Sequence, residues 1–177
     1  MNRKSIPEGI LMEDVAELKG VLRAILEKIG ARNVDILLNS TERSPRILFI
    51  CSVSSVKAEN ISNHFGEDFS KTKVYREVFS NPGTIANRNW TSPPKETRMS
   101  ARILAEEAGL KYLQFSALIA GHDLKIAAGI LTVGFAKMPE EKTIKESERA
   151  LKYWAQSEES ELVKLIDQRY EFVGPPA

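Results

Sequence analysis

The single cysteine of the chain, Cys51, is the residue best suited by its type to nucleophilic or redox chemistry. It follows the apolar run Ile47–Ile50, and no Arg or His stands beside it in the sequence to favour the reactive thiolate. A thiol in such a setting behaves as a small apolar side chain. The sequence therefore predicts a buried and unreactive Cys51.

The two histidines, His64 and His122, are the other side chains that could take part in metal binding. Neither is accompanied by Cys, Asp or Glu at the spacings typical of metal-ligand sets. We therefore expect structural roles for both residues and no metal site.

The segment around Cys51 resembles the opening of low-molecular-weight tyrosine phosphatases and arsenate reductases, in which a strand ends in Cys and a phosphate-cradling loop follows. Six residues after the Cys that family has an Arg followed by a Ser, where this chain has Lys57 and Ala58. Lys cannot form the bidentate fork of a guanidinium. The chain also has no Asp-Pro pair for a general-acid loop, and a strand at 33–39 precedes the motif. A Cys51-dependent enzyme of this type stays an alternative, and we expect no enzyme.

The composition is that of a globular domain without an electrostatic signature. Of 177 residues, 42% are hydrophobic and 28% are charged, with Lys plus Arg 25 against Asp plus Glu 24. This balance offers no basic surface to nucleic acid or to an anionic membrane, and no apolar run approaches the roughly 18 residues of a membrane span. A lone cysteine and an N-terminus without a signal-peptide pattern fit a cytoplasmic protein.

Hydrophobic periodicity predicts that a long helix and a hairpin open the chain. Apolar residues spaced by 3 and 4 draw a stripe along a helix over 8–29, which Gly30 ends. The runs 33–39 and 46–54, joined by a polar turn, predict an antiparallel strand pair. The stripe consists of Leu11, Val15, Leu18, Leu22, Ile25 and Ile29.

The middle of the chain predicts short elements separated by Gly and Pro. Helices are expected over 56–65 and 70–79, followed by an extended piece over 84–90. Ser92 as N-cap and Pro93 as the first helical residue then predict a helix that reaches Ala108.

The last third of the chain has the clearest pattern. Apolar strands over 110–120 and 125–137 flank the turn Gly121–Asp123 and predict an antiparallel hairpin. Thr143 and Glu146 have the spacing of a capping box, which predicts the start of one long amphipathic helix. The apolar face of that helix consists of Ile144, Leu151, Trp154, Leu162, Leu165 and Ile166.

This last third resembles the closing half of a GAF domain, a small-molecule-sensing module. The stretch Tyr112–Ile119, the turn, and the stretch Ile126–Gly134 match its central hairpin in hydrophobicity and small residues. The resemblance implies an α+β fold, with terminal helices on one face of a central antiparallel sheet and short helices and loops over the other. It also implies a single domain over 1–177, with a core of about 8–168 and a tail at 169–177.

The function implied by the resemblance is that of a sensory or regulatory domain without catalysis. Such a domain binds a small molecule and signals through its terminal helices to a separate or fused output protein. Bilin-binding members attach their chromophore through a Cys commonly followed by His, whereas Ser52 follows Cys51. Sulfoxide reductases of this fold use several cysteines, and the Asn-Lys…Phe-Asp-Glu signature of cyclic-nucleotide members is not found in the chain. The ligand stays unidentified, and a GAF-shaped interaction or dimerisation module with a filled pocket stays the alternative.

Candidate ligand contacts come from polar side chains of the hairpin. Alternation along the strand puts Gln114, Ser116 and Leu118 on one face. Recognition of a ligand needs polar groups, so we expect contacts from this face and from Thr132 across the hairpin. Trp90, in the extended piece before the Pro-Pro pair, is expected to line the same pocket.

The girth of the first helix predicts self-association. Ile10, Val21 and Leu26 stand beside its main stripe, and one sheet face can cover only part of such a surface. Wide apolar surfaces are uncommon on monomers. We therefore expect a homodimer with a two-fold helical interface.

Overall fold

A computed structural model describes residues 12–39, 47–54, 64–65, 73–90, 109–120 and 126–169. Its helices are α1 (Met12–Ile29), α2 (Lys73–Ser80), α4 (Glu141–Gln156) and α5 (Glu161–Arg169). Its strands are β1 (Asn33–Asn39), β2 (Ile47–Ser54), β3 (His64–Phe65), β4 (Ala86–Asn89), β5 (Tyr112–Ala120) and β6 (Ile126–Phe135). The fold is α+β, as the sequence predicts.

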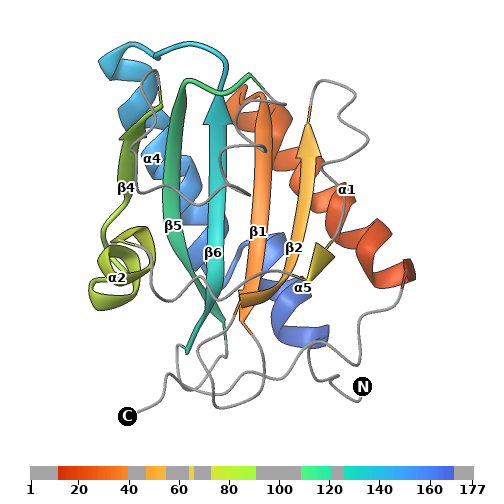
Figure 1. The fold of residues 1–177 in the computed structure, drawn as a ribbon. Helices are drawn as coiled ribbons and strands as arrows, with labels where there is room; N and C mark the ends of the chain where they lie inside the picture. The colour runs from red at the N-terminus through yellow and green to blue at the C-terminus, as the bar shows by residue number, and fades with distance from the viewer. Residues whose placement is uncertain are drawn as a thin grey trace.

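One six-stranded sheet holds these elements together, in the order β3-β2-β1-β6-β5-β4 (Figure 1). Both predicted hairpins are confirmed, because β1 pairs antiparallel with β2 and β5 pairs antiparallel with β6. At the centre of the sheet β1 pairs antiparallel with β6, with Val34 opposite Val133. The two halves of the chain therefore meet in one continuous sheet.

The two faces of the sheet carry different layers. On the face that we call the helix face, α1, α4 and α5 pack together over β1, β5 and β6 (Figure 1). On the opposite face, which we call the α2 face, Val78 of α2 packs with Leu37, Leu113, Phe115 and Ile130. This two-layer cover agrees with the predicted arrangement.

Helix α1 ends where the sequence predicts. Gly30 has a φ of 74°, in the left-handed region that glycine adopts readily. The backbone N–H groups of Gly30 and Ala31 both donate to the carbonyl oxygen of Leu26, at 2.9 and 3.1 Å. Residues 8–11 of the predicted helix lie outside the described residues.

The apolar stripe of α1 is used within the chain itself. Leu18, Leu22, Ile25 and Leu26 are buried in the core of the helix face, and Val21 packs against that core. Among the described residues, the large apolar side chains that are exposed are Met138 and Tyr153. The described part of the stripe is therefore core, and the side chains of Ile10, Leu11 and Val15 lie outside the described ones.

The capping box predicted at Thr143 and Glu146 is wrong. α4 already begins at Glu141, and its N-cap residue Glu140 makes no side-chain capping hydrogen bond. Two carboxylates at the first turn interact favourably with the positive end of the helix dipole. That interaction starts the helix earlier than the predicted cap.

The single long terminal helix is also a wrong prediction, because the chain forms α4 and α5. The break lies at residues 157–160, where the Ser160 hydroxyl donates to the Trp154 carbonyl oxygen at 2.7 Å. The same hydroxyl accepts the Val163 N–H at 3.4 Å. Ser160 therefore closes the end of one helix and caps the start of the next.

The helix predicted over 56–65 does not reach its expected end. His64 and Phe65 form strand β3, opposite Ile50 and Phe49 of β2. The edge of β2 offers backbone donors and acceptors, and pairing satisfies them. The rest of that helix, the helix predicted to end at Ala108 and the turn Gly121–Asp123 lie outside the described residues. No helix among the described residues is long and apolar enough to cross a membrane.

Two glycines allow a matched test of the sheet centre. A Cβ on Gly129 would lie 1.9 Å from the Leu37 carbonyl oxygen, whereas a Cβ on Gly20 of α1 would meet no atom within 4 Å. We expect Gly129→Ala to lower the free energy of unfolding by about 3 kcal/mol or to prevent folding. Gly20→Ala should raise it by about 1 kcal/mol. Urea unfolding measures both, and a Gly129→Ala protein as stable as the wild type would contradict the close β1–β6 approach.

Candidate functional site

Polar side chains gather at the centre of the α2 face. Leu37 lies on this face, and alternation along β1 places Asn33 and Asp35 on the same side. Asp35 is opposite Thr132 of β6 in the strand register. Directly opposite residues in an antiparallel pair share a face, so these three polar side chains form one group.

Buried polar atoms of this face lack hydrogen-bond partners. Asn33, Thr132 and Trp90 are only 2%, 3% and 8% exposed. Within the described part of the chain, Asn33 Oδ1, Thr132 Oγ1 and Trp90 Nε1 have no hydrogen-bond partner. Each such atom costs roughly 1–3 kcal/mol of stability in a buried position.

The orientation of the Asn33 amide follows from its neighbour. Asn33 Nδ2 donates to Asp35 Oδ2 at 2.8 Å. A flipped amide would turn its oxygen toward the carboxylate, which is repulsive. The Asn33 oxygen is therefore the atom left to accept a hydrogen bond from another group.

Apolar side chains surround this polar group on the α2 face. Phe115 of β5 is opposite Thr132, and Ala86 of β4 is opposite Phe115. Leu110 covers Gly134, where a Cβ would lie 2.6 Å from Leu110 Cδ1. The face thus combines a mainly apolar surface with a few polar atoms, which is the usual composition of a small-molecule site.

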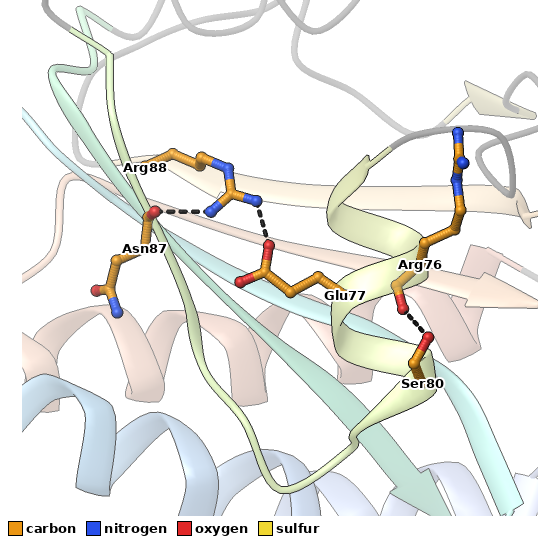
Figure 2. Close-up of polar contacts among 5 residues, drawn as sticks. All are labelled: Arg76, Glu77, Ser80, Asn87 and Arg88. Atoms are coloured by element: carbon orange, nitrogen blue, oxygen red, sulfur yellow. Dashed lines mark hydrogen bonds and ion pairs between the residues drawn. The ribbon is translucent and has the colours of Figure 1, made fainter.

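Helix α2 is attached to β4 on this side by an ion pair. The Arg88 guanidinium contacts Glu77 of α2 and also donates to the Asn87 carbonyl oxygen at 2.9 Å. Figure 2 shows Arg88 reaching toward α2, while the Asn87 side chain points to the other side of the strand. The pair is partly exposed, so its contribution to stability is about 1 kcal/mol or less. Its value is geometric, because it holds α2 beside the strand that leads to Trp90.

The helix face has a polar network of its own, in which the polar groups are paired. Asn87 Oδ1 accepts from the Tyr112 hydroxyl at 2.8 Å and from Gln114 Nε2 at 3.0 Å. Asn87 Nδ2 donates to Glu148 of α4 at 2.9 Å. The Ser147 hydroxyl donates to Gln114 Oε1. These bonds fix the position of α4 on β4 and β5.

A second group of hydrogen bonds attaches the end of α4. Gln156 Nε2 lies 3.2 Å from Ser116 Oγ and 3.3 Å from the Ala117 carbonyl oxygen, and it also donates to the Pro82 carbonyl oxygen. Leu118, next on the same face of β5, is fully buried in the helix-face core. Gln114, Ser116 and Leu118 therefore lie under the terminal helices.

The structure divides the predicted site residues between the two faces. Trp90 and Thr132 lie on the α2 face, whereas Gln114, Ser116 and Leu118 lie on the helix face. The prediction that Thr132 shares a face with Gln114 is wrong, because Thr132 is opposite Phe115 in the register. Asn33 was not predicted, since its place in this polar group depends on the β1–β6 pairing, which no local sequence signal reveals.

The phosphatase alternative does not fit the backbone at Cys51. β2 continues through Cys51 to Ser54, and residues 51–54 pair with Ile36 to Asn33 of β1. A phosphate-cradling loop has to leave the strand at the cysteine, so paired strand residues exclude it here. The Cys51 side chain lies outside the description, and its predicted inertness stays a prediction. Among the described residues, no group of three or more His, Cys, Asp or Glu could hold a metal ion.

The pKa of Tyr112 gives a test of the helix-face network. Burial raises the pKa of Tyr112 above its usual 10.0, and the Glu148 carboxylate raises it further. A raised folded-state pKa gives stability that is present below the unfolded pKa and is lost as the pH rises above about 10. We expect Tyr112→Phe to unfold about 1 kcal/mol more easily near pH 7, because the Asn87 bond is lost. It should also lose less stability than wild type as the solution becomes alkaline.

Urea unfolding across neutral and alkaline pH measures both effects. Tyr153→Phe, on the exposed side of α4, is the matched control and should follow the wild type. Equal alkaline losses in Tyr112→Phe and wild type would show that Tyr112 does not titrate as described.

Comparison with known proteins identifies the fold. No protein-family model matches the chain, and no curated protein sequence matches it. Solved structures do match. A far-red cyanobacteriochrome photoreceptor is 13% identical with a TM-score of 0.56, covering 80% of this chain and 84% of its own.

Two further structures are GAF domains by description. The GAF domain region of a Geobacter sulfurreducens protein is 17% identical, with a TM-score of 0.52 and coverage of 88% of this chain and 98% of its own. The GAF domain of a two-component sensor histidine kinase from Bacillus halodurans is 11% identical, with a TM-score of 0.51 and coverage of 78% and 90%. At identities this low, the structural similarity establishes the fold and does not identify a ligand. The chain has the fold of a GAF domain.

Proposed function

We propose that this chain is a non-catalytic sensory or regulatory domain that binds a small molecule on the α2 face. The observation that supports it best is the set of three buried polar atoms on that face, Asn33 Oδ1, Thr132 Oγ1 and Trp90 Nε1, which have no partner among the described residues. Native proteins leave few such atoms unpaired. A bound ligand that pairs with them offsets a cost of roughly 1–3 kcal/mol for each atom.

The proposed ligand contacts are Trp90 and Thr132 from the predicted set, together with Asn33. Gln114 and Ser116 already bond to α4 through their side chains. Direct contact of a ligand with Gln114, Ser116 or Leu118 stays a prediction. Their hydrogen bonds and burial favour a role in holding the terminal helices.

The proposed output is a change in the packing of α4 and α5. β4 contacts both layers, since Arg88 pairs with Glu77 of α2 and Asn87 bonds to Glu148 of α4. A ligand that shifts α2 therefore acts on the strand that also holds α4. To produce a signal, the ligand has to bind one arrangement of these helices more tightly than another. We propose that a separate or fused output protein responds to this change in helix packing. We also propose that the chain is a single cytoplasmic domain.

The alternative is an interaction or dimerisation module of the same fold without a ligand. Co-purification separates the two functions. We expect protein purified under native conditions to carry a near-stoichiometric small molecule, visible as added mass in native mass spectrometry and released on denaturation. Protein unfolded and refolded in clean buffer is the control. The refolded protein should have a melting midpoint several degrees lower than that of the natively purified protein. Adding back the small molecule released on denaturation should restore the midpoint, because a ligand that binds the folded state stabilises that state.

A native mass equal to that of the chain, and a melting midpoint that no cell extract raises, would favour the interaction module. In that outcome, water forms the hydrogen bonds of the unpaired atoms on the α2 face.

The homodimer stays a prediction, and the fold changes how it is tested. We expect light scattering to show a dimeric mass at micromolar concentration. Leu18→Glu with Leu22→Glu should abolish folding, because both side chains are fully buried in the core and a buried unpaired charge is strongly destabilising. Arg23→Glu, on the exposed side of α1, is the control that should keep the fold. A monomeric wild-type mass would refute the dimer.

A further inference from the structure

The three unpaired atoms of the α2 face differ in what they can bond. Asn33 Oδ1 can only accept a hydrogen bond, and Thr132 Oγ1 can accept or donate one. Trp90 Nε1 can only donate. A ligand that pairs with these atoms therefore needs a hydrogen-bond donor near Asn33 and an acceptor near Trp90, which limits its chemistry.

The donor end of the ligand belongs at β1 and β6. Asn33 and Thr132 are diagonal neighbours on adjacent strands, because Asn33 is opposite Gly134 and Asp35 is opposite Thr132. Diagonal neighbours of this kind are roughly 7–8 Å apart, within reach of one shared group. An amino group has two N–H bonds and can direct one to each oxygen. The Asp35 carboxylate beside them disfavours a ligand carboxylate or phosphate at this end.

The acceptor end belongs beside β4. The backbone N–H of Trp90 donates to the Lys111 carbonyl oxygen at 2.7 Å, so Trp90 continues the β4–β5 pairing by one residue. β4 is two strands away from β6 in the sheet. Thr132 is opposite Phe115, which is opposite Ala86, so Trp90 also lies four residues farther along the strands. Two strand spacings and four residues along a strand put the Cα atoms of Thr132 and Trp90 roughly 16 Å apart. The indole reaches back over part of that distance, and a ring with a substituent at each end, hydrogen-bonded at both, spans the rest.

The surface between the two ends is apolar. Phe115 is opposite Thr132, with Ala86 beyond it on β4 and Leu113 next to it on the same face. The nearest cation of β4, Arg88, is already paired with Glu77. The body of the ligand is therefore apolar or aromatic, and its acceptor does not need a negative charge.

We infer that the ligand of the α2 face is a small aromatic or apolar molecule with an amino group at one end and a hydrogen-bond acceptor at the other. The inference rests on the proposed function and adds the class of ligand. The amino group donates hydrogen bonds to Asn33 Oδ1 and Thr132 Oγ1. The ligand acceptor receives a hydrogen bond from the indole N–H of Trp90.

Three related probes test this class directly. 4-Aminoacetophenone has the amino group, the ring and the carbonyl acceptor, acetophenone lacks the amino group, and aniline lacks the carbonyl. Ligand-detected NMR titration of the full chain gives their affinities. We expect 4-aminoacetophenone to bind about fivefold more tightly than either of the others, the factor that one hydrogen bond contributes.

Two variants assign the two ends. Thr132→Val removes the hydroxyl at constant shape, and it should reduce the preference for 4-aminoacetophenone over acetophenone without lowering the melting midpoint. Trp90→Phe removes the indole N–H and should reduce the preference for 4-aminoacetophenone over aniline. Thr143→Val, on α4, is the matched control and should change neither preference.

Equal affinities for the three probes would overturn the ligand class while the proposed function survives, because a nonselective apolar site still binds small molecules. No detectable binding of any probe would also overturn the class. The proposed function is then judged by the co-purification result, which does not depend on these probes.

Discussion

The pairing of β1 with β6 is the constraint on which the rest of the structure depends. It joins the hairpin of β1 and β2 to the hairpin of β5 and β6, so that residues about a hundred positions apart become neighbours. The close approach at this seam requires Gly129, because a Cβ there would overlap the Leu37 carbonyl oxygen. The same pairing brings α1 beside α5 on the helix face and Asp35 beside Thr132 on the α2 face. Both the core and the candidate site therefore follow from one strand contact.

Strand β4 gives the two faces a physical connection at the other end of the sheet. Successive side chains of a strand point to opposite faces, so Asn87 reaches α4 while Arg88 reaches α2 (Figure 2). The two contacts are unequal in character. Asn87 belongs to a network with Tyr112 and Gln114, which fixes α4 tightly, whereas the Arg88–Glu77 pair is partly exposed and readily exchanged for water. In the proposed signal, the polar attachment of α2 to β4 is therefore the one that changes more easily, and β4 would pass that change to α4.

Local patterns in the sequence predict the elements of this fold well, and they predict the contacts between elements less well. The 3–4 spacing from Leu18 to Ile29, the left-handed Gly30 and the two hairpins all depend on neighbouring residues, and all are confirmed. The capping box failed because Glu140 and Glu141 offer an earlier start to α4. β3 was missed because its formation depends on the open edge of β2. The face shared by Thr132 and Phe115 depends on strand register, which alternation within one strand cannot supply.

The two faces of the sheet differ in how completely their buried polar groups are hydrogen-bonded. On the helix face Gln114 is fully buried, and both its amide nitrogen and its oxygen are bonded, to Asn87, Ile144 and Ser147. On the α2 face Asn33 and Thr132 are almost as deeply buried, yet each keeps an atom without a partner among the described residues. Replacing such groups with apolar ones of the same shape is near neutral or stabilising in general, so stability alone does not explain polar residues there. Under the proposed function, these residues on rigid central strands let the site recognise a ligand by hydrogen bonds as well as by apolar contact.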